Sequence, residues 1–307
     1  MTNALDAKIL VVKVGALGDV LRTTSALRVL GGRLTWMTSE AATPLLAGNP
    51  FVERLYCKEH YPDSLLDEEF DLIVNLEDDI STAALASRIK TKCLVGAYLR
   101  EGKLVYTESA SEWFDMSLIS GLGKKRADEL KMNNRKSYQE FLFSMLGHRF
   151  RGEEYLLNMP FKTKPIPGLV GLEVRAGDVW PMKRWNKFEA LTHRLIDTGF
   201  KVRTFQQRAQ LQDYVDDICE CEYVVSGDTL AMHLGLALRK KVVAIFTCTS
   251  PHEIYDYQRM IKVVSPLWKE YFYRRDFDPA PAEAISVETV FDAVMAVSKS
   301  AISSEDG

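Results

Sequence analysis

The stretch YVVSGDTLAMHLGLAL, residues 223–238, contains a strand, a tight polar turn and the start of a helix. β-favouring residues fill 223–226, and apolar residues at helical spacing begin at Leu230. Asp228 or Thr229 is predicted to cap this helix, which leaves free N–H groups and the positive end of the helix dipole beside the strand. Such a helix start binds anions, and His233 lies within one turn of it. The stretch therefore predicts an α/β domain with a phosphate site; a structural cap beside a buried histidine is the alternative.

Strands and helices alternate on both sides of this stretch. Before it lie predicted strands at 169–174 and 201–205 and helices at 187–198 and 211–219; after it comes a strand at 241–246. The first half repeats the pattern with strands at 8–14, 33–37, 52–57, 71–76 and 93–97, an amphipathic segment at 81–90 and a polar helical region at 113–147. The sequence thus predicts an α/β protein of two Rossmann-like domains with parallel sheets. The proline-rich segment 160–168 is the predicted linker, giving domains 1–160 and 161–285 and a last helix within 286–307.

Composition excludes several classes of protein. The chain has 307 residues, 47% of them hydrophobic, which is enough for two cores. Its 39 basic and 42 acidic residues give a net charge of -3, which argues against a nucleic-acid binder. The five cysteines form no CxxC pair, so neither a disulfide framework nor a zinc site is indicated. No apolar run is long enough to span a bilayer and no secretory signal is evident, so a cytoplasmic protein is expected.

A basic loop follows the strand at 169–174. Arg175, Lys183 and Arg184 lie within ten residues of one another. Because the carboxyl ends of parallel strands share one edge of a sheet, these cations are expected to face the same crevice as the start of the helix at Leu230. Cations beside a helix N-terminus suit a diphosphate better than a neutral ligand.

The loop KVGALGDVLRTTSAL, residues 13–27, resembles a phosphate-binding turn but carries GxxG in place of GxGxxG. Asp19 also stands where a diphosphate would approach the helix. Since neither half has GxGxxG followed by an acid about 20 residues on, a nicotinamide-dependent oxidoreductase is disfavoured. Asp19 is therefore either a helix cap or a carboxylate that acts on a substrate. In the second case, Gly15 and Gly18 would let the substrate approach the backbone closely.

A second basic region lies at 123–136. Six cations, Lys124, Lys125, Arg126, Lys131, Arg135 and Lys136, accompany only Asp128 and Glu129. Such a segment attracts an anionic substrate or an anionic membrane surface, although a solvated helical face has the same composition. Asp78 and Asp79, after the strand at 71–76, are weaker candidates for substrate contact.

The chain resembles glycosyltransferase family 9, the heptosyltransferase family, from about residue 8 to 295. The resemblance is carried by ILVVKVGALGDVLRTTSALR (9–28), by VVSGDTLAMHLGLAL (224–238), and by Lys183-Arg184-Trp185, which is similar to the family's Lys-x-Trp loop. It implies a GT-B fold, in which an acceptor-binding domain and a sugar-nucleotide-binding domain face a central cleft. It also implies that the last helix packs back on the N-terminal domain.

The activity implied by this resemblance is inverting transfer of a sugar, most often heptose from ADP-heptose, to a hydroxyl of a bacterial glycan or glycolipid such as lipopolysaccharide. Asp19 is then the candidate base, and Lys183 and His233 the groups that stabilise the leaving diphosphate. No metal is expected, and no cofactor besides the sugar nucleotide. Peripheral contact with the inner membrane surface is expected. The remaining candidates are Arg175, Gln206, Asp228, Thr229 and Leu230 for the donor, and Gly18, Arg22, Thr23, Lys124, Lys125 and Arg126 for the acceptor.

The sequence departs from the family pattern in the donor region. Leu230 stands where the family usually has glycine, and Phe246-Thr247-Cys248-Thr249 replaces a Phe-Gly-Pro-Thr turn. Gln206 and Gln207 occupy the place of the acid that often contacts the donor ribose, and the C-terminal loop lacks the cysteine cluster of some relatives. The alternatives are an enzyme like the UDP-sugar epimerases of GT-B fold, and a non-catalytic homologue that binds a nucleotide sugar.

Overall fold

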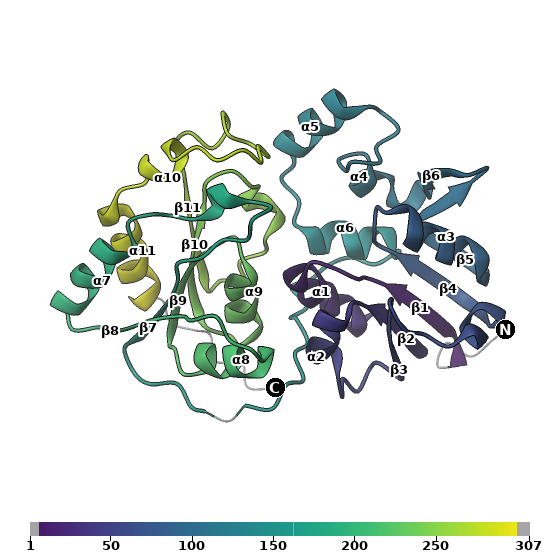
Figure 1. Ribbon diagram of the computed structural model, residues 1–307, viewed down its shortest axis with the longest axis horizontal. Coiled ribbons are helices and arrows are strands. Elements are labelled where there is room, and N and C mark those ends of the chain that lie inside the picture. The colour runs from purple at the N-terminus through teal and green to yellow at the C-terminus, as the bar shows by residue number, and fades with distance from the viewer. Residues whose placement is uncertain (1–5, 162, 300–307) are drawn as a thin grey trace. The chain divides into compact units, whose positions relative to one another are not determined.

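The chain folds into two α/β units, Met1–Met159 and Pro160–Gly307, in a computed structural model that describes residues 6–161 and 163–299 (Figure 1). The division falls where the proline-rich segment begins. Each unit is built around its own sheet, with helices packed against it. The predicted α/β class with mostly parallel sheets is confirmed.

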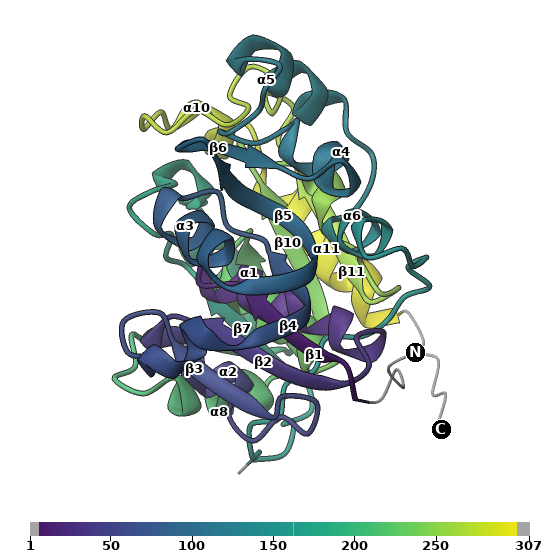
Figure 2. The same ribbon diagram turned by 90° about the vertical axis from the view of Figure 1, so that its right-hand side faces the viewer.

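The sheet of the first unit has six strands in the order β3-β2-β1-β4-β5-β6, which follow one another in Figure 2. Strand β1 is central because all but its first residue are buried apolar side chains, as expected for a parallel strand covered on both faces. Its last residue, Val12, pairs with Met37 of β2 and Asn75 of β4. The strands are β1 Lys8–Val12, β2 Arg33–Thr38, β3 Arg54–Cys57, β4 Glu69–Asn75, β5 Lys90–Arg100 and β6 Lys103–Tyr106.

The helices of the first unit are short. Helix α6 begins with a capping box in which the Ser137 hydroxyl accepts from the Glu140 N–H and the Glu140 carboxylate accepts from the Ser137 N–H. The region expected to be polar and helical contains three helices, α4, α5 and α6. The helices are α1 Leu17–Thr23, α2 Thr43–Leu46, α3 Ile80–Arg88, α4 Ser111–Phe114, α5 Lys124–Asn133 and α6 Tyr138–Met145.

The sheet of the second unit has five parallel strands in the order β11-β10-β9-β7-β8. Sequence patterns located four of them, and missed β11 in this unit and the antiparallel strand β6 in the first. The strands are β7 Leu169–Glu173, β8 Lys201–Thr204, β9 Tyr223–Gly227, β10 Lys241–Phe246 and β11 Met260–Val264. The helices are α7 Phe188–Asp197, α8 Leu211–Cys219, α9 Leu230–Ala237, α10 Ala280–Glu283 and α11 Val287–Lys299.

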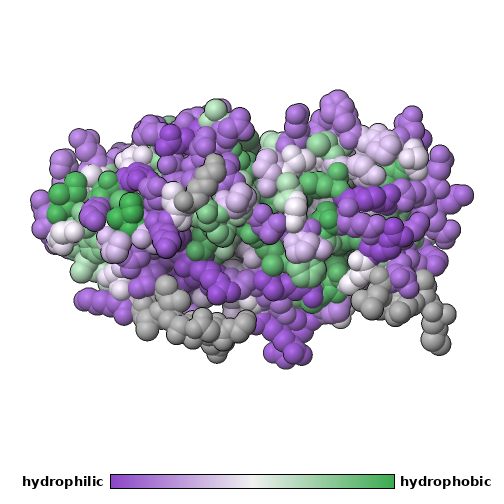
Figure 3. Space-filling view, turned by 90° about the horizontal axis from the view of Figure 1, so that it is seen from below, coloured by the Kyte–Doolittle hydropathy of each residue, from purple (hydrophilic) through white to green (hydrophobic). Residues whose placement is uncertain are grey.

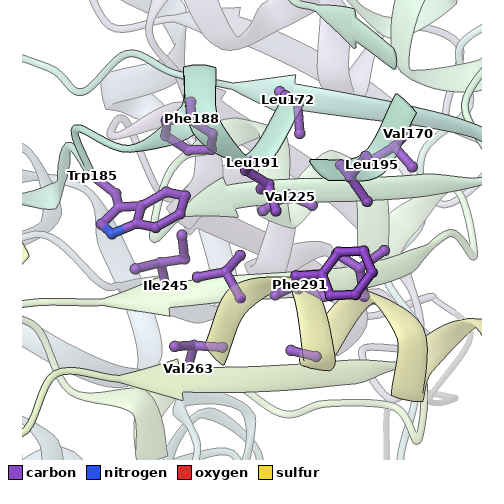
Figure 4. Packing of buried hydrophobic residues seen from close by; sticks show 14 of the residues in the cluster. Val170, Leu172, Trp185, Phe188, Leu191, Leu195, Val225, Ile245, Val263 and Phe291 are labelled. Atoms are coloured by element: carbon purple, nitrogen blue, oxygen red, sulfur yellow. The ribbon is translucent and has the colours of Figure 1, made fainter. Parts of the chain in front are cut away.

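Helix α11 corrects one expectation, because its apolar face is buried in the second unit's own core. Figure 4 shows Phe291 of this helix packed near Leu195 and Val225. Val290, Val294 and Val297 belong to the same buried cluster. The return to the first domain that the family resemblance implied is therefore not seen for this apolar face, which α7 and the neighbouring strands cover.

The surface seen in Figure 3 mixes hydrophilic residues with smaller hydrophobic areas. Within residues 6–161 and 163–299, no helix combines the length and the apolar character that crossing a bilayer requires. All five cysteines are free thiols.

Candidate functional site

The register of the second sheet brings several predicted donor residues to one edge. Ser226 of β9 is level with Glu173 of β7 on one side and with Ala244 of β10 on the other. Because all three strands run in the same direction, the residues that follow them emerge side by side. Arg175, Asp228 and Thr247 leave this edge within three residues of those paired positions.

Lys183 and Asp228 form an ion pair at this edge. The Lys183 Nζ lies 2.7 Å from Asp228 Oδ2, and the two side chains are only 17% and 14% exposed. Asp228 Oδ2 also accepts a hydrogen bond from the Thr249 hydroxyl at 2.8 Å. A lysine from the loop after β7 is therefore held directly beside the start of helix α9.

Close packing fixes the Lys183 loop against the sheet. The loop contains a short 3-10 helix, Pro181–Lys183, whose Met182 carbonyl accepts a hydrogen bond from the Thr247 hydroxyl at 2.6 Å. A Cβ at Gly227 would lie 2.5 Å from the Lys183 carbonyl oxygen, so only glycine allows this approach. Gly227 and Thr247 thus position the ammonium group of Lys183.

Burial and charge act on Asp228 in opposite directions. Burial alone would raise the pKa of this carboxyl. The charges of Lys183 and His233, together with hydrogen bonds from Lys183 and Thr249, outweigh the effect of burial and lower the pKa to about 2. Asp228 is therefore an anion at neutral pH. The structure brings it together with Lys183 and His233, as the sequence predicts.

The start of α9 differs in detail from the predicted cap. Thr229 is the N-cap residue, but its side chain makes no capping hydrogen bond, and its hydroxyl lies 2.7 Å from the Ser226 hydroxyl. Asp228 is occupied by Lys183 and does not cap the helix. Half-buried Leu230 is the first helical residue, and His233, in the first turn, is 5% exposed.

Arg175 lies at the same edge but is neutralised. Its guanidinium binds both carboxylate oxygens of Glu173, at 2.8 and 2.7 Å, and donates to the Gln207 side chain at 2.9 Å. The Tyr214 hydroxyl donates to the same Glu173 carboxylate, and burial raises the pKa of Tyr214. Gln206 is exposed and donates to the Thr204 carbonyl. Arg175 is consequently a weaker anion ligand than its position after the strand suggested.

A cavity of about 450 Å³ opens in the second unit beside these residues. It adjoins both clusters along the chain, since Val174 precedes Arg175 and Arg184 follows Lys183. Trp185 and Phe188 give it apolar walls, while Thr192 and Thr204 supply hydroxyl groups. Arg184, Asn186 and Glu189 complete the lining, so the cavity combines apolar walls with several polar and charged groups.

The first unit carries a second polar cluster, at the carboxyl ends of β1 and β4. The Lys13 Nζ lies 3.0 Å from Glu77 Oε1, and both side chains are at most 15% exposed. The same oxygen accepts the backbone N–H groups of Val14 at 2.6 Å and Gly15 at 3.2 Å. Burial would lower the pKa of Lys13, but the attraction of Glu77 and then of Asp19 raises it. Glu77 therefore fixes the loop that leads to Asp19.

Asp19 lies in the first turn of α1, where Ala16 is the N-cap, so it is not the cap of its helix. Arg22 donates to Asp19 Oδ1 at 2.9 Å, and its guanidinium stacks 3.9 Å from the centre of the Tyr138 ring. The side chain of Asp19 is 36% exposed and that of Arg22 9%. The structure thus presents a carboxylate to solvent and fixes it from behind by a buried arginine.

Three other predicted acceptor residues, Gly18, Arg22 and Thr23, are buried in the first unit. Thr23 is buried, and its hydroxyl bonds the Asp19 carbonyl and the Tyr138 hydroxyl, both at 2.7 Å, so Thr23 is withdrawn as an acceptor contact. Arg22 is buried as well, at 8% exposed, so its side chain is not a solvated residue on the surface of the helix. Gly18 is buried too, whereas a Cβ at Gly15 would meet nothing within 4 Å.

The remaining charged candidates are of two kinds. Lys124, Lys125 and Arg126 are exposed in the first turn of α5. Asp79 is the cap of α3 and accepts from the Ser81 and Thr82 N–H groups at 2.9 and 3.1 Å. Burial would raise the pKa of Asp79, but hydrogen bonds from the Ser81 and Thr82 hydroxyl groups, and then from the Thr82 N–H, lower it to about 2. Its role is therefore structural.

Sequence reasoning missed Lys13, Glu77 and Tyr138. A signal for the first two was present, since each follows an apolar strand and the two strands pair in parallel with Val12 opposite Asn75. Polar residues directly after neighbouring parallel strands meet at one edge. Tyr138 comes from a helix more than a hundred residues away along the chain, and no local pattern links it to Arg22.

Metal-binding groups were also sought. In the part of the chain that the structure describes, His, Cys, Asp and Glu side chains form no group of three or more that could hold a metal ion.

Comparisons with solved structures identify the fold. E. coli ADP-heptose lps heptosyltransferase II matches with a TM-score of 0.64 and 16% identity over 94% of this chain and 98% of that chain. E. coli heptosyltransferase WaaC with ADP matches with a TM-score of 0.63 and 15% identity over 95% and 98%. TibC from enterotoxigenic E. coli, described as an iron-containing dodecameric glycosyltransferase, matches with a TM-score of 0.57 and 14% identity over 96% and 76%. At these identities the likeness shows the fold, which is that of GT-B glycosyltransferases.

A family model matches part of the second unit. Residues 207–275 match the model of glycosyltransferase family 9 (heptosyltransferase). This segment runs from the residue after Gln206 through β9, α9, β10 and β11, and includes Asp228, Thr229, Leu230 and His233. No curated protein sequence matches the chain. The predicted resemblance to family 9 is thus confirmed, and with it the enzyme class, a glycosyltransferase.

Proposed function

We propose that the protein is an inverting glycosyltransferase that moves a sugar, heptose from ADP-heptose, to a hydroxyl group of a glycan or glycolipid. The observation that carries the proposal is the buried ion pair of Lys183 and Asp228 beside the start of α9. It places the Lys183 ammonium group beside the first N–H groups of helix α9, and a diphosphate is bound by such a combination.

The donor is proposed to bind at the edge of the second sheet. Lys183, the α9 N-terminus and His233 would share the charge of the leaving diphosphate, and Asp228 would hold Lys183 in place through its 2.7 Å contact. Leu230 provides a helical N–H group there, and Thr229 is the N-cap residue beside it, whose own N–H donates to the Gly227 carbonyl at 2.8 Å. The cavity of about 450 Å³ offers room for the nucleoside, near Gln206 and Arg175. Solved structures of similar fold carry ADP and an ADP-heptose analogue, which supports an adenine nucleotide.

Asp19 is proposed as the catalytic base. Its carboxylate would take the proton of the acceptor hydroxyl while that oxygen bonds to the anomeric carbon and the bond from this carbon to the diphosphate breaks, releasing ADP. A carboxylate with an ordinary pKa can do this because the hydroxyl becomes acidic only as the new bond forms. The partial exposure of Asp19 and its pairing with Arg22 support this role.

The acceptor is proposed to be anionic, such as a phosphorylated lipopolysaccharide core or another bacterial surface polysaccharide under construction. Lys124, Lys125 and Arg126 supply local positive charge in a protein whose net charge is -3. We place the reaction in the cytoplasm, at the inner face of the cytoplasmic membrane. No cofactor other than the sugar nucleotide is proposed.

Calorimetry with ADP, UDP, GDP and CDP tests the donor site. We expect selective binding of ADP that falls at least tenfold in Lys183→Ala and His233→Ala, since each removes a charge or donor from the proposed diphosphate site. Lys269→Ala removes an exposed lysine of the same unit and is the matched control. Selective UDP binding would instead favour another donor or an epimerase-like enzyme, and binding of none of the four would favour a non-catalytic homologue.

Turnover of Asp19→Asn tests the base. Asparagine keeps the size of the side chain and can still accept from Arg22, so the fold and ADP binding should be unchanged. The rate should fall by on the order of 10² to 10⁴. Asp67→Asn, at an exposed acid of the same unit, should leave the rate unchanged. Near-normal turnover of Asp19→Asn would end the base hypothesis.

A further inference from the structure

The loop between α4 and α5 exposes two leucines. Leu118 is 79% exposed and Leu122 is 53% exposed, whereas large apolar side chains elsewhere in the described chain are mostly buried. Single exposed apolar residues are common on protein surfaces and need no explanation. Two exposed leucines four positions apart in one loop, directly before a basic helix, are a different case, because apolar and positively charged side chains are then exposed in one short segment.

Hydrogen bonds and ring stacking fix the conformation of this loop, so the two leucines are exposed on an ordered segment. The Tyr106 hydroxyl accepts the Gly121 N–H at 3.0 Å and donates to the Asp115 carboxylate. Tyr106 also stacks on Phe114, with ring centres 5.4 Å apart. Within the loop, Ser120 N–H donates to the Ser117 carbonyl and Gly123 N–H to the Ser120 carbonyl, each at 3.3 Å. The turns therefore point Leu118 and Leu122 away from the unit's core.

Positive charge surrounds the leucines. Residues 117–136 contain six basic and two acidic residues, a local net charge of about +4. Lys124, Lys125 and Arg126 are all exposed and follow Leu122 within four residues. Asp128 and Glu129 pair with Lys124 and Arg126 on the helix surface, and such exposed pairs are weak.

We propose that this surface, the loop 117–123 with the first turn of α5, docks the protein on an anionic lipid membrane. Leu118 and Leu122 enter the boundary between headgroups and acyl chains, while Lys124, Lys125 and Arg126 contact anionic headgroups. An acidic protein would match the charge, but it would not require two adjacent exposed leucines. The inference deepens the proposed function, since the lipid surface that carries a glycolipid acceptor becomes the partner of the acceptor-binding unit.

Vesicle flotation of the full chain, without any nucleotide, tests the proposal. The probes are vesicles of phosphatidylcholine alone and of phosphatidylcholine mixed with phosphatidylglycerol in equal parts. We expect binding to the mixed vesicles only, weakened by added salt because the headgroup contact is electrostatic. Absence of binding to the mixed vesicles at low salt overturns the proposal, whatever calorimetry shows for ADP.

Two sets of variants locate the contact. Leu118→Ser with Leu122→Ser should reduce the partition constant at least tenfold, because two apolar side chains no longer enter the lipid. Ile196→Ser, at a 54% exposed residue of α7 in the second unit, is the matched control and should bind like the wild type. If the leucine variant also binds like the wild type, the apolar contact is wrong.

Neutralisation tests the charges. Lys124→Gln, Lys125→Gln and Arg126→Gln together should reduce binding by on the order of 10²-fold, at about fivefold for each charge. Arg149→Gln, Lys201→Gln and Lys269→Gln remove three exposed charges elsewhere and leave the same net charge. Equal loss in both triple variants would show that total charge, and not this surface, controls binding, and would overturn the assignment. ADP calorimetry on the leucine variant should match the wild type, which separates a failed membrane surface from a failed donor site.

Discussion

Asp228→Asn should destabilise the second unit in a pH-dependent way. The pKa of Asp228 falls from an ordinary value of 3.8 to about 2 in the folded protein, where Lys183 and Thr249 bind it. A difference of this size corresponds to about 2 kcal/mol of stabilisation of the folded state. The side chain is only 14% exposed, so solvent screening reduces the figure little.

The sign and the pH range follow from the direction of the shift. The carboxylate contributes its full stabilisation above the pKa of an unfolded aspartate, and the contribution is lost as pH falls towards 2. The wild type should therefore exceed Asp228→Asn in unfolding free energy by about 2 kcal/mol at neutral pH and by about half as much near pH 3. Asparagine retains an oxygen that can accept from Thr249, so the lost charge is the main change.

Hydrogen exchange of the β9 amides provides the assay, because it reports the opening of the second unit alone. Urea unfolding followed by tryptophan fluorescence gives a second measurement. Asp292→Asn, at an exposed acid of α11, is the control and should show no difference at either pH. A deficit in Asp228→Asn that is the same at neutral pH and near pH 3, or that is absent, would refute the assignment of an anionic Asp228 paired with Lys183.

Other predictions concern positions whose surroundings are equally well defined. Gly227→Ala should lower the unfolding free energy by about 1–3 kcal/mol and weaken ADP binding, because the new Cβ would lie 2.5 Å from the Lys183 carbonyl oxygen. Thermal unfolding measures the first effect and calorimetry the second. Gly177→Ala, whose new Cβ would meet nothing within 4 Å, should change neither. Glu77→Gln should cost about 3–5 kcal/mol in urea unfolding, since it leaves the buried ammonium of Lys13 without its counter-ion, and adding Lys13→Met should recover most of that loss. Failure of the second substitution to restore stability would show that the ion pair is not the cause. Ser286→Ala should lower the unfolding free energy by about 1 kcal/mol, because the Ser286 hydroxyl caps α11 by accepting the Thr289 N–H at 3.0 Å. The loss should be measurable as a lower Tm. An unchanged Tm would contradict this capping role.

Much of the fold followed from local patterns. The continuous apolar runs of β1, β9 and β10 are typical of parallel strands buried on both faces, and the structure has them close to the predicted limits. The strands that were missed lack that pattern: β6 has only half-buried and exposed residues, and β11 lies after an irregular aromatic loop. The sequence pattern was therefore sufficient to locate a strand where both faces of that strand are buried.

The candidate sites were predictable only where chemistry and strand ends coincide. Lys183, Asp228 and His233 come from elements whose order in the sheet follows from the alternation of strands and helices. The pairing of Arg175 with Glu173 was not predictable, because Glu173 belongs to an apolar strand whose side-chain direction the sequence does not specify. Nor was the stacking of Arg22 on Tyr138, which depends on how α6 packs against α1.

The burial of α11 among Trp185, Leu195 and Val263 makes the core of the second unit complete from its own residues. All residues of this buried cluster come from the second unit. A unit of this kind can in principle be expressed alone, and it can be exchanged between related chains without rebuilding its interior. Under the proposed function, changes in one half of the gene would alter the use of the sugar nucleotide, and changes in the other half the use of the acceptor, in separate steps.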